Sequence, residues 1–399
     1  MPGNYVHPRL DPNDRFRERR RQSIVRRRRR RLAAVTILLA LGAGLGAGAT
    51  VIGGRKHPDV SSTPAIREAP ARVEQPAARV AWPREVRGVH VTMALAGLEG
   101  KVAEYVALKA YGLNTLEVDV KDENGKIGFV SAAMPKLARQ IGAAQPYYDV
   151  GKVVRTVHAA DQVHAGRVVV MEDPTLSAAR PDLALLRPDG SRWLNNGGLG
   201  WVNPYDDRVW RYVVGVGKAA AKAGFDEIQF DYVRFPSDGD VSQIVFRHKV
   251  REPKGTTIAR FLRYAGARLH PLGVRVSADV FGLAATHDLR IGQVPRRVAK
   301  YVDALYPMVY PSHFSSGEYG IPDPDAYPGR TVARALFDFR RQVKGTKTAL
   351  IPWLQDFSLA HQYGLIEVTD QIAAARRQHA RGFLLWNPEG VYTQEALTN

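Results

Sequence analysis

Eight short runs rich in β-branched and aromatic residues recur along the chain from residue 86 onward, with longer stretches of helical character between them. This alternation is typical of a parallel sheet whose strands are joined by crossover helices. The runs lie at 86–92, 113–120, 165–172, 226–233, 273–280, 302–310, 348–355 and 382–387. Eight repeats suit a closed barrel better than an open doubly wound sheet. We therefore predict an α/β fold of the (β/α)8 TIM-barrel type.

The segments between the runs predict four helices, at 99–111, 207–223, 258–269 and 369–381, with Gly112, Gly224 and Gly382 at their C-terminal ends. The second and third strand-to-helix connections are long and are expected to hold extra loops. No glycine-rich phosphate loop follows any run, so we expect no nucleotide and no other cofactor.

The first 81 residues differ in composition from the rest. Residues 1–31 form a basic tail with twelve Arg against Asp11, Asp14 and Glu18, which supplies half of the net charge of +18. The uncharged stretch 32–54 that follows is long enough to cross a bilayer as a helix, and an Arg-dense flank stays in the cytoplasm. We expect a single-pass anchor in the cell membrane with the barrel outside, or secretion if this segment is a cleaved signal.

Residues 55–81 carry four prolines among Ala, Arg and Glu, a composition that predicts a semi-rigid linker. The barrel is then expected at 82–399. Because the Arg-rich tail reads as a membrane-orientation signal, we expect no nucleic-acid partner. The chain has no cysteine, which excludes disulfides, Cys-ligated zinc and thiol catalysis.

Three of the predicted strands alternate apolar with polar residues, and the polar face of each includes an aspartate near its C-terminal end. These are Asp119, Asp231 and Asp279. If the apolar residues face the helices, the three carboxyl groups point into the barrel mouth, where barrel enzymes place their chemistry. The alternative is that they form internal ion pairs with Lys121, Arg234 or Arg275, because a buried unpaired carboxylate is costly.

Seven segments of the chain resemble a known bacterial family, the "putative glycosyl hydrolase domain" proteins, over roughly residues 84–395. The segments are RGVHVT, LNTLEVDVKDENG, FDEIQFDYVRFPSDG, SADVFG, YPMVYPSHF, IPWLQDF and LLWNPEG. The resemblance implies a (β/α)8 barrel of the glycoside-hydrolase type, often extracytoplasmic, and it does not imply a particular sugar. More distantly, the chain is similar to clans with an Asp nucleophile at the end of strand four, the position of Asp231.

Glycoside hydrolysis needs two carboxyl groups beside the scissile bond, one ionised and one protonated. We predict Asp231 and Asp279 as this pair, with Arg234 keeping Asp231 ionised and burial keeping Asp279 protonated. Their placement on neighbouring strands predicts retention of anomeric configuration. Glu172, Asp173 and Asp119 stay open as alternative acids.

Further polar and aromatic residues are expected to line a sugar-binding cleft. They are His90, Asp119, Lys121, Arg234, Tyr310, His313, Trp353, Gln355, Trp386 and Asn387. Core packing is the alternative for Trp353 and Trp386, and an interior structural role is the alternative for His90. A cation held by His90, Asp119, Asp231 and His313 lacks any short-spaced ligand motif, so we expect no metal.

The sequence therefore predicts a glycoside hydrolase whose partner is an extracytoplasmic polysaccharide or cell-wall glycan. The positive charge that remains outside the tail favours an anionic glycan. Two other classes stay open: a barrel that binds polysaccharide without cleaving it, and a metal-dependent deacetylase or phosphodiesterase.

Overall fold

The computed structural model of the chain describes residues 79–247 and 252–398. Within them, all strands belong to one parallel sheet in the order β5-β4-β3-β2-β1-β9-β8-β6-β7, which a further β5–β6 pairing closes into a barrel. The strands are β1 (Val86–Val91), β2 (Thr115–Lys121), β3 (Val163–Val169), β4 (Glu227–Asp231), β5 (Arg275–Phe281), β6 (Ala304–Met308), β7 (Ala349–Leu350), β8 (Trp353–Gln355) and β9 (Gly382–Trp386).

Strands β7 and β8 occupy one position in the barrel, because both pair with β6. Pro352 lies between them and has no N–H to donate to the neighbouring strand, which accounts for the break. The nine strands thus occupy eight strand positions around the barrel, and the predicted (β/α)8 architecture is confirmed.

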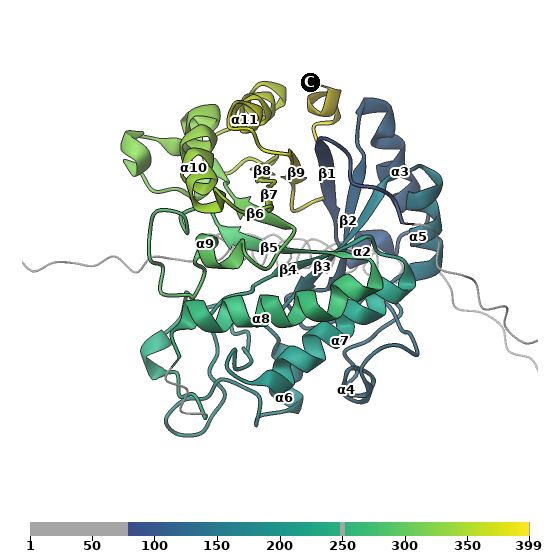
Figure 1. Cartoon of the computed structure of the whole chain (residues 1–399), viewed down its shortest axis with the longest axis vertical. Helices are drawn as coiled ribbons and strands as arrows, with labels where there is room; N and C mark the ends of the chain where they lie inside the picture. The colour runs from purple at the N-terminus through teal and green to yellow at the C-terminus, as the bar shows by residue number, and fades with distance from the viewer. Residues whose placement is uncertain (1–78, 248–251, 399) are drawn as a thin grey trace, which may run out of the picture. The chain divides into compact units, whose positions relative to one another are not determined.

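The helices surround the strands (Figure 1). They are α2 (Met93–Ala96), α3 (Lys101–Ala107), α4 (Lys136–Gln140), α5 (Val150–Ala159), α6 (Pro174–Ala179), α7 (Asp207–Ala223), α8 (Lys254–Leu269), α9 (Pro295–Val298), α10 (Pro328–Val343) and α11 (Leu365–Arg377). The helix predicted at 207–223 has the same first and last residues as α7, whereas α5 and α10 were not predicted. Gly112 and Gly224 end helical segments with positive φ, but Gly382 is the first residue of β9.

Strand alternation divides the core into two layers. Val118, Ile228 and Val276 are fully buried in the larger cluster, which includes residues of the surrounding helices. Tyr306, Trp353 and Leu384 belong to a smaller cluster built from strand residues and the loops that follow them. Apolar packing therefore fills part of the barrel interior, and polar side chains occupy the rest.

The chain enters the barrel at the N-terminal ends of the strands. Trp82 Nε1 donates to Glu227 Oε2 at 3.0 Å, and burial raises the pKa of Glu227 to about 7. Upstream, Val80 N donates to Asp226 Oδ1 at 3.1 Å, and Arg79 Nη2 donates to the Leu272 carbonyl at 2.9 Å. Contacts with the barrel therefore begin before residue 82, where the sequence placed its start.

The predicted tail (1–31), the predicted membrane span (32–54) and nearly all of the linker lie outside the described residues. Among the helices that are described, none combines the length and the apolar character that crossing a bilayer requires.

Candidate active site

The strand register brings the predicted aspartates to one end of the barrel. Asp119 on β2 is level with Arg167 on β3, and Arg167 is level with Gln229 on β4. Phe230 is level with Ala278, so the next residue along each strand places Asp231 beside Asp279. Adjacent strands are about 4.8 Å apart, so these two carboxyl groups start from neighbouring backbone positions at the mouth.

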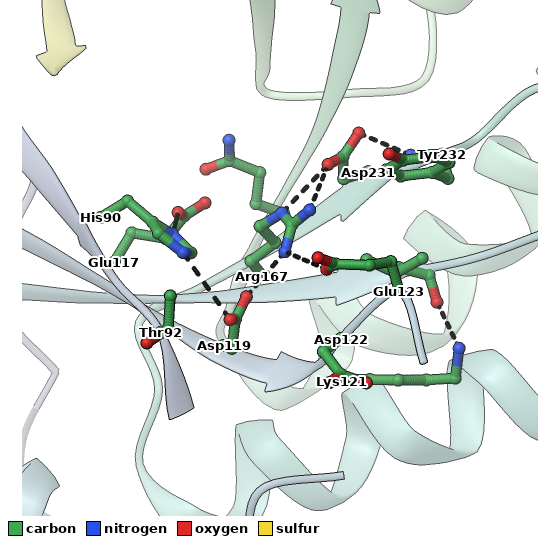
Figure 2. A network of polar contacts seen from close by, with 12 residues as sticks. His90, Thr92, Glu117, Asp119, Lys121, Asp122, Glu123, Arg167, Asp231 and Tyr232 are labelled. Atoms are coloured by element: carbon green, nitrogen blue, oxygen red, sulfur yellow. Dashed lines mark hydrogen bonds and ion pairs between the residues drawn. The ribbon is translucent and has the colours of Figure 1, made fainter. Parts of the chain in front are cut away.

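Arg167 joins two of the three aspartates (Figure 2). Its Nη1 donates to Asp119 Oδ1 at 2.7 Å, while Nε and Nη2 donate to Asp231 Oδ2 at 3.0 and 2.8 Å. The Glu123 carboxylate lies 3.7 Å from Nη1. The other oxygen of Asp231, Oδ1, accepts the backbone N–H of Tyr232 at 2.6 Å. Both oxygens of Asp231 are therefore held by donors.

Asp279 has a different environment. Its side chain is buried, and its Oδ1 accepts Gln229 Nε2 at 2.6 Å and Trp353 Nε1 at 2.9 Å. Burial raises the pKa of Asp279 well above its ordinary value, and the negative charge of Asp231 raises it further. The environments of Asp231 and Asp279 thus differ in the way that an acid–base pair requires.

A second pair of buried groups lies on the β1–β2 side. His90 Nδ1 is 2.5 Å from Glu117 Oε2, and His90 Nε2 is 3.7 Å from Asp119 Oδ2. Burial lowers the pKa of His90 to about 4 and raises that of Glu117 well above its ordinary value. A neutral His90 can either donate or accept at Nε2, depending on where Glu117 leaves the Nδ1 proton.

Aromatic rings cover His90 on one side. The Trp386 ring lies 4.6 Å from the His90 ring, and the Trp353 ring lies 6.1 Å from Trp386, both measured between centroids. Trp353 is buried, whereas Trp386 is partly exposed. A partly exposed ring beside buried polar groups is suited to stacking against a sugar.

The family model for the "putative glycosyl hydrolase domain" matches residues 88–392, which include every residue of this network. The chain belongs to this family. No curated protein matches the chain. A solved hypothetical protein of Ruminiclostridium thermocellum is 37% identical over 48% of this chain and 97% of its own, with a TM-score of 0.44.

Other solved structures share the barrel at low sequence identity. The glycoside hydrolase domain of PgaB (BpsB) from Bordetella bronchiseptica is 13% identical over 77% of this chain and 95% of its own, with a TM-score of 0.53. An inactive variant of an exo β-N-acetylglucosaminidase from Vibrio harveyi is 14% identical over 79% of this chain and 54% of its own, with a TM-score of 0.51. These two similarities show the fold alone.

Within this glycosyl-hydrolase barrel, Lys121 and Asp173 lie apart from the Arg167 network. The register of β2 shifts by one residue between Asp119 and Lys121, so Lys121 does not continue the face of Asp119. Lys121 Nζ is instead 3.1 Å from Asp173 Oδ2, a fully buried ion contact without hydrogen-bond geometry, and donates to the Val169 carbonyl at 2.8 Å. Asp173 Oδ1 accepts Leu176 N at the start of α6. Both residues thus have buried partners outside the Arg167 network.

Arg234 does not fill the role that the sequence assigned to it. Its buried guanidinium lies over the rings of Trp201, Tyr232 and Phe281, and Arg167 is the cation that binds Asp231. The alternative acid Glu172 is also buried, and its Oε2 accepts Asn195 Nδ2 at 3.1 Å.

The remaining predicted cleft residues lie at the end of β8 and on the loops after β6 and β9. Gln355 is fully buried and binds Ser312 and Phe357, so it joins two loops. Asn387 Oδ1 accepts Glu389 N at 2.8 Å within a turn. Tyr310 is buried with its ring 5.3 Å from that of His313, which is partly exposed. Of these four, Gln355 and Tyr310 are buried, whereas His313 and Asn387 are partly exposed.

Arg167 was not among the site residues predicted from the sequence, and no role was predicted for Glu117 or Gln229. Arg167 stands inside the apolar run AGRVVVME, where a charged side chain needs a buried partner. That pattern was the available signal. In residues 79–247 and 252–398, no group of three or more His, Asp or Glu side chains is arranged to hold a metal ion.

Proposed function

We propose that the chain is a glycoside hydrolase in which Asp231 is the ionised carboxylate and Asp279 is the protonated acid. One observation carries the proposal: Asp231 is paired with Arg167, while its neighbour Asp279 is buried without a cation among its hydrogen-bond donors. Opposite charge favours an ionised carboxyl group and burial favours a neutral one. The two required protonation states are thus assigned to two adjacent residues.

The donors at Asp279 also fix where its proton lies. Oδ1 accepts two N–H groups, from Gln229 and Trp353, so the proton of the neutral acid belongs on Oδ2. A glycosidic oxygen at Oδ2 would receive this proton as the bond breaks. Asp231 would then attack the anomeric carbon or stabilise its positive charge.

We further propose that the reaction retains anomeric configuration. The register sets Asp231 and Asp279 side by side on adjacent strands, which suits the roughly 5–5.5 Å between carboxyl groups of retaining enzymes better than the roughly 6.5–9.5 Å of inverting ones. Proton NMR of the first product, recorded before mutarotation, tests this. An inverted product would require a more distant partner for Asp231, such as Glu172 or Asp119.

The charge of the site favours a substrate without negative groups. Arg167 is surrounded by Asp119, Glu123 and Asp231 at 2.7 to 3.7 Å, so its single positive charge is exceeded by its carboxylate partners. A uronic acid or phosphate at this position would meet repulsion. We therefore propose a neutral or amino-sugar residue at the cleaved position, in contrast to the anionic glycan that the net charge of the chain favours, because local charge governs contact.

Reducing-end release by a fragment of residues 76–399 tests the function and the substrate class together. Neutral polymers (β-glucan, chitin), an amino polymer (chitosan) and acidic polymers (polygalacturonate, alginate) form the panel. Release from the first two groups is expected. Release from the acidic group alone would contradict the proposed substrate charge, and no release from any polymer or from cell-wall preparations would favour a non-catalytic glycan-binding barrel.

The location of the barrel outside the cell membrane remains a proposal supported by the order of the Arg run and the apolar stretch 32–54. Protease added to intact spheroplasts is expected to digest the barrel. Survival until the membrane is lysed would place the barrel inside.

A further inference from the structure

Tyr232, directly after Asp231, has a backbone conformation that its side chain disfavours. Its φ is +50°, in the left-handed region, and its side chain is buried. Residues with a bulky Cβ substituent rarely adopt this region, and when they do, such strain often occurs at functional sites. Something in the surrounding structure must therefore hold Tyr232 in place.

The left-handed turn has a direct effect on Asp231. It directs the N–H of Tyr232 back to Asp231 Oδ1 at 2.6 Å, opposite the oxygen that Arg167 binds (Figure 2). The carbonyls of Asp231 and Tyr232 accept Val170 N and Met171 N at 2.9 and 3.3 Å, so the turn is also tied to the chain beyond β3. The carboxylate is thereby fixed from both sides.

The Arg234 side chain lies against the Tyr232 ring. Its guanidinium carbon lies 4.8 Å from the centroid of Tyr232, 4.9 Å from that of Trp201 and 4.6 Å from that of Phe281. Nη1 also donates to Ser237 Oγ at 3.0 Å. Planar stacking of this kind is specific to arginine, because a lysine ammonium has no flat face.

The three rings come from separate parts of the barrel. Tyr232 follows β4, Phe281 ends β5 two residues after Asp279, and Trp201 lies in the long connection between β3 and β4. A displacement of Arg234 would therefore reach the strand ends that carry both proposed catalytic carboxyl groups.

We propose that Arg234 and its aromatic cage keep Tyr232 in the left-handed conformation, and that Tyr232 in turn aims the Asp231 carboxylate. Arg234 and Tyr232 are then positioning residues and do not contact the substrate. This inference rests on the proposed function for its effect on turnover, but its structural content is independent of it.

Two substitutions separate aiming from folding. Tyr232→Gly permits the left-handed conformation but no longer enforces it, because glycine populates both signs of φ. Arg234→Lys keeps the charge and loses the stacking. Tyr319→Gly is the matched control, since Tyr319 also has a positive φ, +56°, but lies on the loop after β6.

The activity assay uses the 4-nitrophenyl β-glycoside that the wild type cleaves fastest among the glucoside, galactoside, N-acetylglucosaminide and glucosaminide. Tyr232→Gly is expected to lower kcat about 100-fold with KM changed less than threefold, since a small misplacement of a catalytic group acts on the chemical step. Tyr319→Gly should lower the melting temperature and leave kcat unchanged.

A crystal structure of Tyr232→Gly gives a readout that needs no substrate. We expect the distance from residue 232 N to Asp231 Oδ1 to exceed hydrogen-bond range. If the hydrogen bond and kcat are both kept in Tyr232→Gly and Arg234→Lys while Asp231→Asn is inactive, the positioning role is wrong and the proposed function stands. If Asp231→Asn is itself fully active, the proposed function fails, and the crystal structure alone decides the positioning role.

Discussion

Arg167 donates two hydrogen bonds to a single oxygen of Asp231, from Nε at 3.0 Å and from Nη2 at 2.8 Å, while its third nitrogen binds Asp119. The guanidinium is therefore a rigid spacer between the carboxyl groups of β2 and β4. Arg167 thus holds Oδ2 of Asp231, and the Tyr232 N–H holds Oδ1.

Arg167→Met should destabilise the protein by about 3–5 kcal/mol and abolish activity, because it leaves two buried carboxylates without a cation. Arg167→Lys should fold but turn over more slowly, because one ammonium cannot reproduce the planar contacts. Urea unfolding measures the first effect. The control is Arg208→Met, which also removes an arginine between two aspartates, Asp182 and Asp206, but at a partly exposed site where a loss of roughly 1 kcal/mol or less is expected.

Asp231→Asn should reduce kcat by several orders of magnitude with little change in KM, because an amide cannot serve as the anionic group in the transition state. Asp119→Asn is the matched variant, since it removes the other partner of Arg167. Both should lower the melting temperature to a similar degree. Equal losses of turnover in the two variants would mean that the Arg167 network, and not Asp231 in particular, supports catalysis.

Asp279→Asn should remove the basic limb of the pH–activity profile. Burial raises the pKa of Asp279, so the protonated acid persists at low pH and is lost as the pH rises through the raised value. An activated aryl glycoside, whose leaving group needs no proton, should still be cleaved by this variant. Burst kinetics with that substrate measure the first step directly, and a variant inactive toward it would assign Asp279 another role.

His164→Leu should reduce the acid sensitivity of the fold. The imidazole is fully buried 4.0 Å from the Phe225 ring, neither of its nitrogens has a hydrogen-bond partner among the described residues, and burial lowers its pKa to about 3. The unfolded chain therefore binds a proton that the native chain does not, and stability falls as the pH drops from about 6.5 toward 3. Urea unfolding at pH 7 and pH 5 should show a smaller difference in the variant. An unchanged difference would place the acid sensitivity elsewhere.

A fragment that begins at residue 83 should be less stable than one that begins at residue 76. Removing Arg79 and Trp82 deletes donors to the Leu272 carbonyl and to buried Glu227, which would be left with an unsatisfied oxygen at a cost of about 1–3 kcal/mol. Trp82→Phe in the longer fragment isolates the Glu227 contact. Equal melting temperatures for all three proteins would show that the N-terminal segment adds no stability.

The sequence by itself determined the barrel and the three aspartates at its mouth. Alternate residues of a strand face opposite sides of the sheet, so the buried face of a strand can be recognised from its own sequence. The two-residue period in β2, β4 and β5 is therefore visible without knowledge of the neighbouring strands. The resemblance of motifs such as FDEIQFDYVRFPSDG to the glycosyl hydrolase family added the reaction class. The local sequence pattern did not predict the division of the seventh strand into β7 and β8 at Pro352. It also did not predict helices α5 and α10.

Only the tertiary structure decided which charges meet. Arg234 is three residues from Asp231 in sequence, yet it lies among aromatic rings, whereas Arg167 is 64 residues away and binds Asp231 because β3 is adjacent to β4. Lys121 lies two residues from Asp119 and is directed to Asp173 by a register shift. Partners of buried charges are set by strand register across the barrel, which is a long-range property that no local pattern in one chain encodes.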